Sequence, residues 1–139
     1  MSQSALRTIL HIDDDAGLRF LMREVAEEGA RPQASPIRWL EAGGVSEAVE
    51  RYRTERPDLV LLDNRLRGAE GVDLLSQVRA AWGCPVWILT GAPDEALERR
   101  AVAGGAAGVA SKDELLEDPA RLRGFLQAAA DPRPASLQS

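Results

Sequence analysis

Five polar residues suited to chemistry follow directly on short apolar segments, each about as long as a β-strand. They are Asp13, Asp14, Asp63, Thr90 and Lys112. Three carboxylates that meet at one point repel each other and need a cation, and all-oxygen ligation with retained waters favours Mg²⁺. A carboxylate beside a cation, a hydroxyl and an ammonium group is suited to accept a phosphoryl group, because those groups hold the charged equatorial oxygens of the transition state. We therefore interpret Asp63 as a nucleophile that would form an acyl phosphate.

Lys112 is set apart by the composition of the chain. It is the only lysine among the 17 lysine and arginine residues. The abundance of arginine has a simple explanation in a coding bias, but that explanation does not account for the retained lysine. Arginine presents a broad planar fork, whereas lysine is a compact point charge. A site with room only for a small ammonium group would keep its lysine, and this favours a functional role for Lys112.

The elements that would carry these residues alternate between short apolar segments and helical patterns. Strands are expected at residues 8–12, 37–41, 59–62, 86–89 and 108–111. Helices are expected from Asp15 to Gly29, from Ser46 to about Arg56, over residues 72–82 and 94–102, and from Asp118 to about residue 130. Such alternation predicts an open parallel sheet covered by helices on both faces. The carboxyl ends of its strands, where ligands bind in sheets of this kind, carry the five polar residues.

Local signals refine this outline. Asp15, Ser46 and Asp118 are suitable N-cap residues, because their side chains can accept a hydrogen bond from the first turn of a helix. The aliphatic residues at 59–62 would be apolar on both faces of a strand, which predicts a central place in a parallel sheet. Residues 30–36 and 65–71 are expected to be loops, since they are rich in turn-forming and polar residues.

Length, charge and cysteine content narrow the function. The chain has 139 residues, which suits one domain, and we expect a core at residues 6–130 and a disordered tail at 131–139. The net charge of −5 argues against direct nucleic-acid binding, because a phosphate backbone requires a basic surface. No signal-peptide pattern is present, and no apolar segment approaches the ~18 residues of a membrane span. Cys84 is the only cysteine, which fits a reducing, cytoplasmic location.

Four motifs, read in order, resemble the receiver domain of two-component response regulators. They are HIDDD after the first strand, LVLLDNRL around Asp63, ILTG at Thr90 and GVASK at Lys112. The resemblance covers about residues 6–130. It implies an α/β fold, a flavodoxin-like (βα)5 doubly wound parallel sheet with strand order 2-1-3-4-5. In that order the segments ending at the Asp13–Asp14 pair and at Asp63 are neighbours.

The resemblance also implies roles for the site residues. Asp13, Asp14 and Asp63, with the backbone carbonyl of Arg65, would bind Mg²⁺. Asp63 would take the phosphoryl group from a phosphohistidine on a sensor histidine kinase, assisted by Thr90 and Lys112. Such a domain catalyses only its own phosphorylation and dephosphorylation. Acting alone, it would signal by docking to an unidentified downstream protein or by relaying the phosphoryl group, and receivers also pair as homodimers through the helix 4–strand 5–helix 5 face.

Three positions depart from the pattern of the family. Val109 stands where receivers usually have an aromatic switch residue, three positions before the lysine. Asp113 replaces the usual proline after the lysine, and Arg67 replaces a proline four positions past the nucleophile. These departures motivate an alternative function, a pseudo-receiver that acts as an interaction module and is not switched by phosphorylation.

Two further classes rank lower. A phosphatase of the haloacid dehalogenase type would carry its nucleophilic aspartate after the first strand, whereas Asp63 follows the third. A flavodoxin-like cofactor binder would need a phosphate-binding loop rich in Ser, Thr and Gly after the first strand, and the chain has aspartates there. His11, the only histidine, lies within the first expected strand, where it would be buried and unsuited to a phosphorelay.

Overall fold

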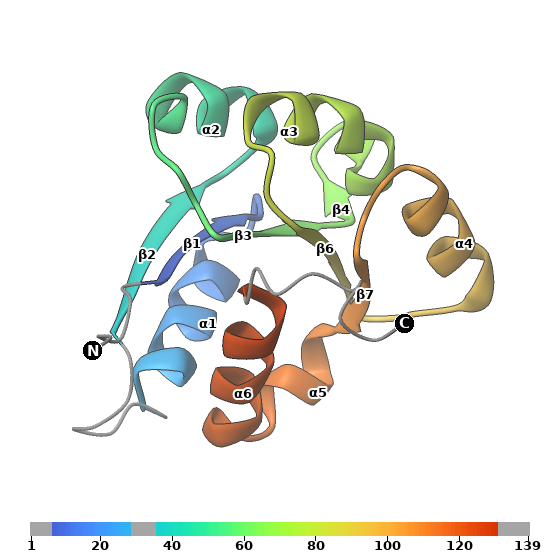
Figure 1. Cartoon of the computed structure of the whole chain (residues 1–139). Coiled ribbons are helices and arrows are strands. Elements are labelled where there is room, and N and C mark those ends of the chain that lie inside the picture. Colours follow the sequence, from blue (N-terminus) through green and yellow to red (C-terminus); the bar gives the residue numbers. More distant parts are fainter. Residues whose placement is uncertain (1–6, 29–35, 131–139) are drawn as a thin grey trace, which may run out of the picture.

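The computed structural model describes residues 7–28 and 36–130, which form a central sheet covered by helices (Figure 1). Five parallel strands lie in the order β2-β1-β3-β6-β7. They are β1 (Arg7–Ile12), β2 (Ile37–Ala42), β3 (Leu59–Asp63), β6 (Val86–Thr90) and β7 (Gly108–Ser111). Because β4 and β5 lie outside this sheet, the order corresponds to 2-1-3-4-5. The predicted flavodoxin-like fold class is therefore confirmed.

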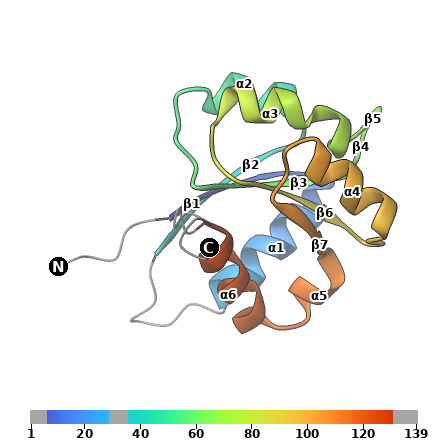
Figure 2. The same ribbon diagram turned by 45° about the vertical axis from the view of Figure 1, so that its right-hand side comes forward.

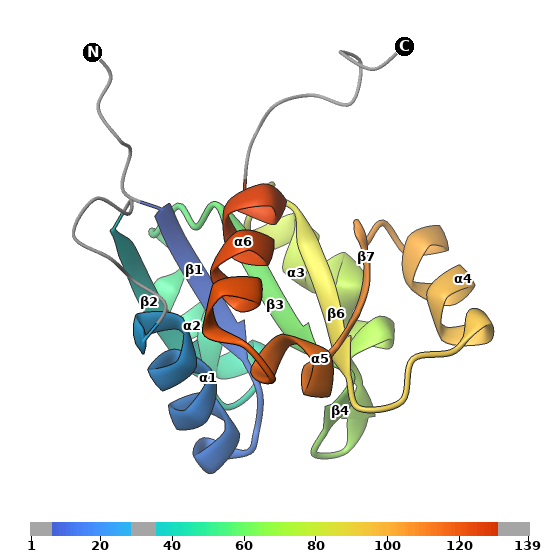
Figure 3. The same ribbon diagram turned by 90° about the horizontal axis from the view of Figure 1, so that it is seen from below.

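Helices cover both faces of the sheet, as Figure 2 shows. One face carries α2 (Val45–Tyr52), the 3₁₀ turn η1 (Gly71–Leu74), α3 (Leu75–Ala81) and α4 (Glu95–Ala103). The other face carries α1 (Ala16–Glu28), α5 (Lys112–Leu116) and α6 (Pro119–Ala130), which lie in front of the strands in Figure 3. Within the described residues no helix has the length and apolar character needed to cross a bilayer.

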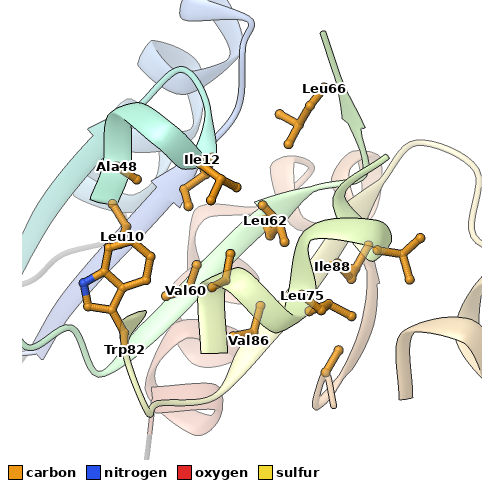
Figure 4. Close-up of a cluster of buried hydrophobic side chains, with 14 of the residues drawn as sticks. Leu10, Ile12, Ala48, Val60, Leu62, Leu66, Leu75, Trp82, Val86 and Ile88 are labelled. Carbon is orange, nitrogen blue, oxygen red and sulfur yellow. The ribbon is translucent and has the colours of Figure 1, made fainter. Parts of the chain in front are cut away.

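Strand β3 is central because it is apolar on both faces. All five of its residues are buried. Val60 and Leu62 point into the cluster beneath α2 and α3, which Figure 4 shows. Leu59 and Leu61 point into the opposite cluster, under α1 and α6. This two-sided burial carries Asp63, the last residue of the strand, into the interior as well, where only 2% of it is exposed.

Two of the three predicted helix caps are present. Asp15 accepts a hydrogen bond from the backbone N–H of Leu18, and Asp118 accepts one from Ala120. The Ser46 prediction is wrong, because α2 begins at Val45 and its N-cap is Gly44, which has no capping side chain. Instead, Glu47 reaches back and accepts a hydrogen bond from the backbone N–H of Gly43.

The structure differs from the sequence prediction at three further places. Residues 65–71, expected to be a loop, contain a small antiparallel hairpin of β4 (Arg65–Leu66) and β5 (Ala69–Glu70). Helix α2 ends at Tyr52 rather than near Arg56, and a short helix, α5, follows β7 directly. The predicted helix end at Gly29, the loop at 30–36 except for its last residue, and the tail at 131–139 lie outside the described residues.

Replacing a core leucine tests the central place of β3. We expect Leu62→Ala to lower the free energy of unfolding by about 2–5 kcal/mol, because Leu62 is fully buried and truncation leaves a cavity. Leu21→Ala is the matched control, since Leu21 lies on α1 with 46% of its surface exposed, and its effect should stay within about 1 kcal/mol. Urea unfolding followed by circular dichroism measures both. Equal effects would contradict the assigned burial.

Candidate functional site

A cleft of about 790 Å³ opens at the carboxyl ends of β1, β3, β6 and β7. All six residues predicted for the site line this cleft. They are Asp13, Asp14, Asp63, Arg65, Thr90 and Lys112. Parallel strands end at one edge of the sheet, and the reversal of strand order between β1 and β3 opens a crevice there. The fold therefore gathers residues that are up to a hundred positions apart in sequence.

Three carboxylates form the floor of the cleft. Asp13, Asp14 and Asp63 each offer one oxygen, and the three oxygens all lie within 4.8 Å of one another. Asp13 follows β1 and Asp63 ends the neighbouring strand β3, so the pairing of these two strands sets their proximity. Asp13 and Asp63 are almost fully buried, with 1% and 2% of each residue exposed.

Lys112 supplies the positive charge next to these carboxylates. Its Nζ forms an ion pair with Oδ1 of Asp63 and lies 3.6 Å from Oδ2 of Asp13. The lysine is the first residue of α5, which Ser111 caps by accepting a hydrogen bond from the backbone N–H of Glu114. The start of this helix fixes the backbone from which the ammonium group reaches the cleft.

The donor set fits a divalent metal ion. Asp13 Oδ2 is buried and accepts no hydrogen bond within the described part of the chain. A buried oxygen of this kind, beside two further carboxylates, is the arrangement that a hard cation such as Mg²⁺ stabilises by direct ligation. One lysine cannot balance three carboxylates, so these residues can hold a divalent cation without an excess of positive charge.

The charge states of the carboxyl groups follow from burial and crowding. The pKa of Asp63 is raised to about 6, mainly by burial; the contact with Lys112 opposes this rise, and the charges of Asp13 and Asp14 add to it. Burial also raises the pKa of Asp13. In the metal-free protein these groups therefore resist ionisation. A bound cation reverses the effect, because a nearby positive charge favours the carboxylate form.

Thr90 and Arg65 lie at the walls of the cleft. Thr90 ends β6 and is half-buried, and its Oγ1 accepts a hydrogen bond from the backbone N–H of Ala92 at 3.1 Å. Arg65 is exposed and lies opposite Glu70 in the strand register of the β4–β5 hairpin. Both residues line the cleft. The catalytic role of Thr90 and the metal-binding role of the Arg65 carbonyl stay predictions.

Sequence reasoning did not identify the residues that hold the hairpin over the cleft. The side-chain Oδ1 of Asn64 accepts a hydrogen bond from the backbone N–H of Val72, and its carbonyl oxygen accepts one from Gly71. Gly71 approaches the strand end closely, since a Cβ there would lie 2.3 Å from the carbonyl oxygen of Asp63. The only sequence signals were an Asn and a Gly, both common in turns.

His11 is fully buried, as expected, and neither of its ring nitrogens has a hydrogen-bond partner among the described residues. Burial, followed by the charges of Lys112 and Arg19, lowers its pKa to about 3, so the imidazole is neutral at physiological pH. The ring packs edge-to-face against Trp39, with the ring centroids 5.8 Å apart. Its surroundings leave no access for a phosphoryl donor.

The sequence profile of the response regulator receiver domain matches residues 9–123. The chain belongs to this family. Among curated relatives, sporulation initiation phosphotransferase F of Bacillus subtilis is 35% identical over 72 residues, which are 51% of this chain and 52% of that protein. The transcriptional regulatory protein PdtaR of Mycobacterium tuberculosis is 29% identical over 112 residues, 81% of this chain and 52% of that protein.

Other comparisons agree on the family and the fold. The DNA-binding response regulator MtrA of Mycobacterium tuberculosis is 37% identical over 86 residues, which are 62% of this chain and 35% of MtrA. The chain thus spans about half the length, or less, of these relatives. The crystal structure of the chemotaxis protein CheY4 of Vibrio cholerae superimposes with a TM-score of 0.75 at 20% identity, covering 90% of this chain and 99% of that one. That structural likeness supports the fold.

The raised pKa of Asp63 predicts a pH-dependent stability in metal-free protein. The folded-state pKa of about 6 lies above the ordinary value of 3.8, so the contribution of this carboxyl group is fully present below pH 3.8 and is lost as the pH rises through 6. We expect Asp63→Asn to exceed the wild type in free energy of unfolding by about 1–3 kcal/mol at pH 7. The difference should shrink toward pH 4.

Urea unfolding in the presence of EDTA at several pH values measures this difference. Asp113→Asn is the matched control, because Asp113 is exposed next to Lys112, and it should leave the pH dependence of the wild type unchanged. A difference between wild type and Asp63→Asn that does not vary between pH 4 and pH 7 would contradict the assigned environment of Asp63.

Proposed function

We propose that this receiver domain accepts a phosphoryl group on Asp63 from a phosphohistidine of a sensor histidine kinase, with Mg²⁺ bound by Asp13, Asp14 and Asp63. The observation that carries this proposal is that three carboxylates, two of them buried, lie together with Lys112 in one cleft. We further propose that residues 1–139 work as a single, stand-alone receiver in the cytoplasm and catalyse only their own phosphorylation and dephosphorylation.

The chemistry begins with the carboxylate of Asp63. One of its oxygens forms a bond to phosphorus as the bond between phosphorus and the donor's imidazole nitrogen breaks, and the electron pair of that bond stays on the imidazole. Bound Mg²⁺ would neutralise the carboxylates and the oxygens of the transferred group. Lys112 would hold a second phosphoryl oxygen, and the hydroxyl of Thr90, with backbone N–H groups, would hold the third. The carbonyl of Arg65 would be a further ligand of the metal.

We propose that the output is docking to a downstream protein or onward transfer of the phosphoryl group. The net charge of −5 supports a protein partner over direct contact with DNA, although one relative is a DNA-binding regulator. Pairing through α4, β7 and α6, the elements that correspond to the helix 4–strand 5–helix 5 face, is part of the same proposal. Chromatography with light scattering, before and after phosphorylation, measures whether the chain pairs.

A pseudo-receiver is the second candidate function, and a specific observation favours it. Val109 lies in β7 where the family usually has an aromatic residue, so the usual coupling between a threonine and a moving ring cannot operate here. In this alternative the domain would bind its partner in one fixed state. The intact cluster of carboxylates and Lys112 supports the phosphorylated receiver instead.

Incubation with acetyl phosphate and Mg²⁺ distinguishes these two functions. We expect the wild type to gain one phosphoryl group, detected by intact-mass spectrometry and located at Asp63 by reduction with borohydride and peptide mapping. Asp63→Asn should gain none while keeping the circular dichroism spectrum of the wild type. Absence of labelling in the wild type would favour the pseudo-receiver, and undiminished labelling of Asp63→Asn would refute the assignment of the nucleophile.

Exchanging Lys112 for arginine tests the need for a compact ammonium group. Lys112→Arg keeps the charge, but its wider planar head cannot occupy the same position beside Asp63, so we expect phosphorylation to slow by about tenfold or more. Arg99→Lys, an exposed exchange of the same two residue types on α4, is the control and should leave the rate unchanged. A wild-type rate for Lys112→Arg would mean that charge alone matters at this position.

A further inference from the structure

Arg19 connects the segment after β1, which carries Asp13 and Asp14, to the edge strand β2. Its side chain projects from α1 and is only 19% exposed. Nη1 donates a hydrogen bond to the backbone carbonyl of Asp13 at 2.5 Å, and Nε donates one to Oε1 of Glu41 at 3.3 Å. One guanidinium group thus binds the segment after β1 and the carboxylate on β2 at the same time.

Glu41 is itself held in place, so it can anchor Arg19. Its second oxygen accepts a hydrogen bond from Arg23 at 2.9 Å, and its backbone carbonyl accepts one from the hydroxyl of Tyr52 at 3.0 Å. These contacts therefore restrict the position of the Arg19 side chain. The planar fork of arginine suits this bridge, because its N–H groups point in fixed and different directions.

The Asp13 carbonyl that Arg19 holds belongs to the peptide group that joins Asp13 to Asp14, two of the three carboxylates in the cleft. Other contacts fix Asp13 on its remaining sides. Its backbone N–H donates to the carbonyl of Ala42 at 3.0 Å, and its Oδ1 accepts from the backbone N–H of Asp15 at 2.9 Å. Without Arg19 the peptide group after Asp13 would lose the side-chain donor on its carbonyl.

Charge and geometry make opposite predictions for this residue. A guanidinium group near an acidic cleft repels an entering cation, so loss of the positive charge alone should strengthen cation binding. Loss of the hydrogen bond should weaken binding, because the two carboxylates would no longer be held in one orientation. The sign of the change in affinity therefore separates the two effects.

We infer that Arg19 is a positioning residue for the cation site, and that its hydrogen bond to the Asp13 carbonyl outweighs its repulsion of the bound cation. This inference rests on the proposed function, because it concerns the Mg²⁺ that Asp13, Asp14 and Asp63 would share. Of the two arginines of α1, the inference concerns only Arg19, because Arg19 donates to the Asp13 carbonyl. Arg23 also pairs with Glu41, but its side chain is 46% exposed.

Titration of the full chain with MgCl₂ in a calorimeter tests the inference without any phosphoryl donor. We expect Arg19→Gln to bind Mg²⁺ about tenfold more weakly than the wild type, although it removes a positive charge. Arg19→Lys keeps the charge but loses the two-armed bridge, and it should also bind more weakly. Arg99→Gln, which removes one positive charge from the exposed surface of α4, is the matched control and should stay within about twofold of the wild type, as an exposed ion pair contributes little.

Thermal unfolding of each variant without Mg²⁺ shows whether a loss of affinity comes from a loss of fold. Equal or tighter Mg²⁺ binding by Arg19→Gln would overturn the inference and leave the proposed function standing. If Arg19→Gln does not fold, the Mg²⁺ affinity of Arg19→Lys tests the inference instead. An Mg²⁺ affinity of Arg19→Lys equal to that of the wild type would then overturn the inference. A wild type that binds no Mg²⁺ would overturn the proposed function and this inference together.

Discussion

The burial of like charges at the end of a buried strand is the constraint on which the rest of the site depends. Asp13 and Asp63 are nearly inaccessible to water, and Asp14 lies beside them, so three carboxyl groups share one small space. Neither burial nor mutual repulsion favours ionisation there. The only ammonium side chain of the protein lies against them and offsets part of the cost. The remaining imbalance favours the binding of a small, highly charged cation.

The topology of the sheet determines where the carboxyl group of Asp63 lies. Strand β3 must be central because both of its faces are apolar, and its last residue is therefore enclosed by β1 and β6. The hairpin that follows is held to the strand end by Asn64, and the close approach of Gly71 to the Asp63 carbonyl leaves no room for a side chain. The backbone around Asp63 is thus fixed on both sides of the residue. If Asp63 is the nucleophile that we propose, it would not have to be reordered when a phosphoryl donor arrives.

Sequence patterns predicted what depends on periodicity and strand ends. The five strands, their order and the residues at their carboxyl ends follow from the alternation of apolar segments and the resemblance of four motifs. The hairpin, the short helix α5 and the role of Arg19 did not follow, because each depends on contacts between residues distant in sequence or on weak local preferences. Arg19 looked like any helical arginine until the structure placed Glu41 and the Asp13 carbonyl around it.

The helix N-caps also show that residue type alone does not fully predict local structure. Ser46 has a good N-cap side chain, yet α2 begins one residue earlier, and the carboxylate of Glu47 satisfies the N–H of Gly43 instead. The predictions for Asp15 and Asp118 are confirmed, and each of these residues stands directly before the first residue of its helix. Where two side chains can satisfy the same end of a helix, residue type alone does not decide between them.

If the chain signals as we propose, the state of the cleft would reach a partner by a route other than the usual aromatic switch of the family. With Val109 in β7, no aromatic ring is available at that position to follow the occupancy of the cleft. The hairpin that lines the cleft is joined to α4 by Arg100, which pairs with Glu70 and with Asp73 in η1. All three side chains are about half exposed or more, so these ion pairs are individually weak and can be broken at little cost. Ion pairs of this strength would let the hairpin and α4 move relative to each other if phosphorylation alters the cleft.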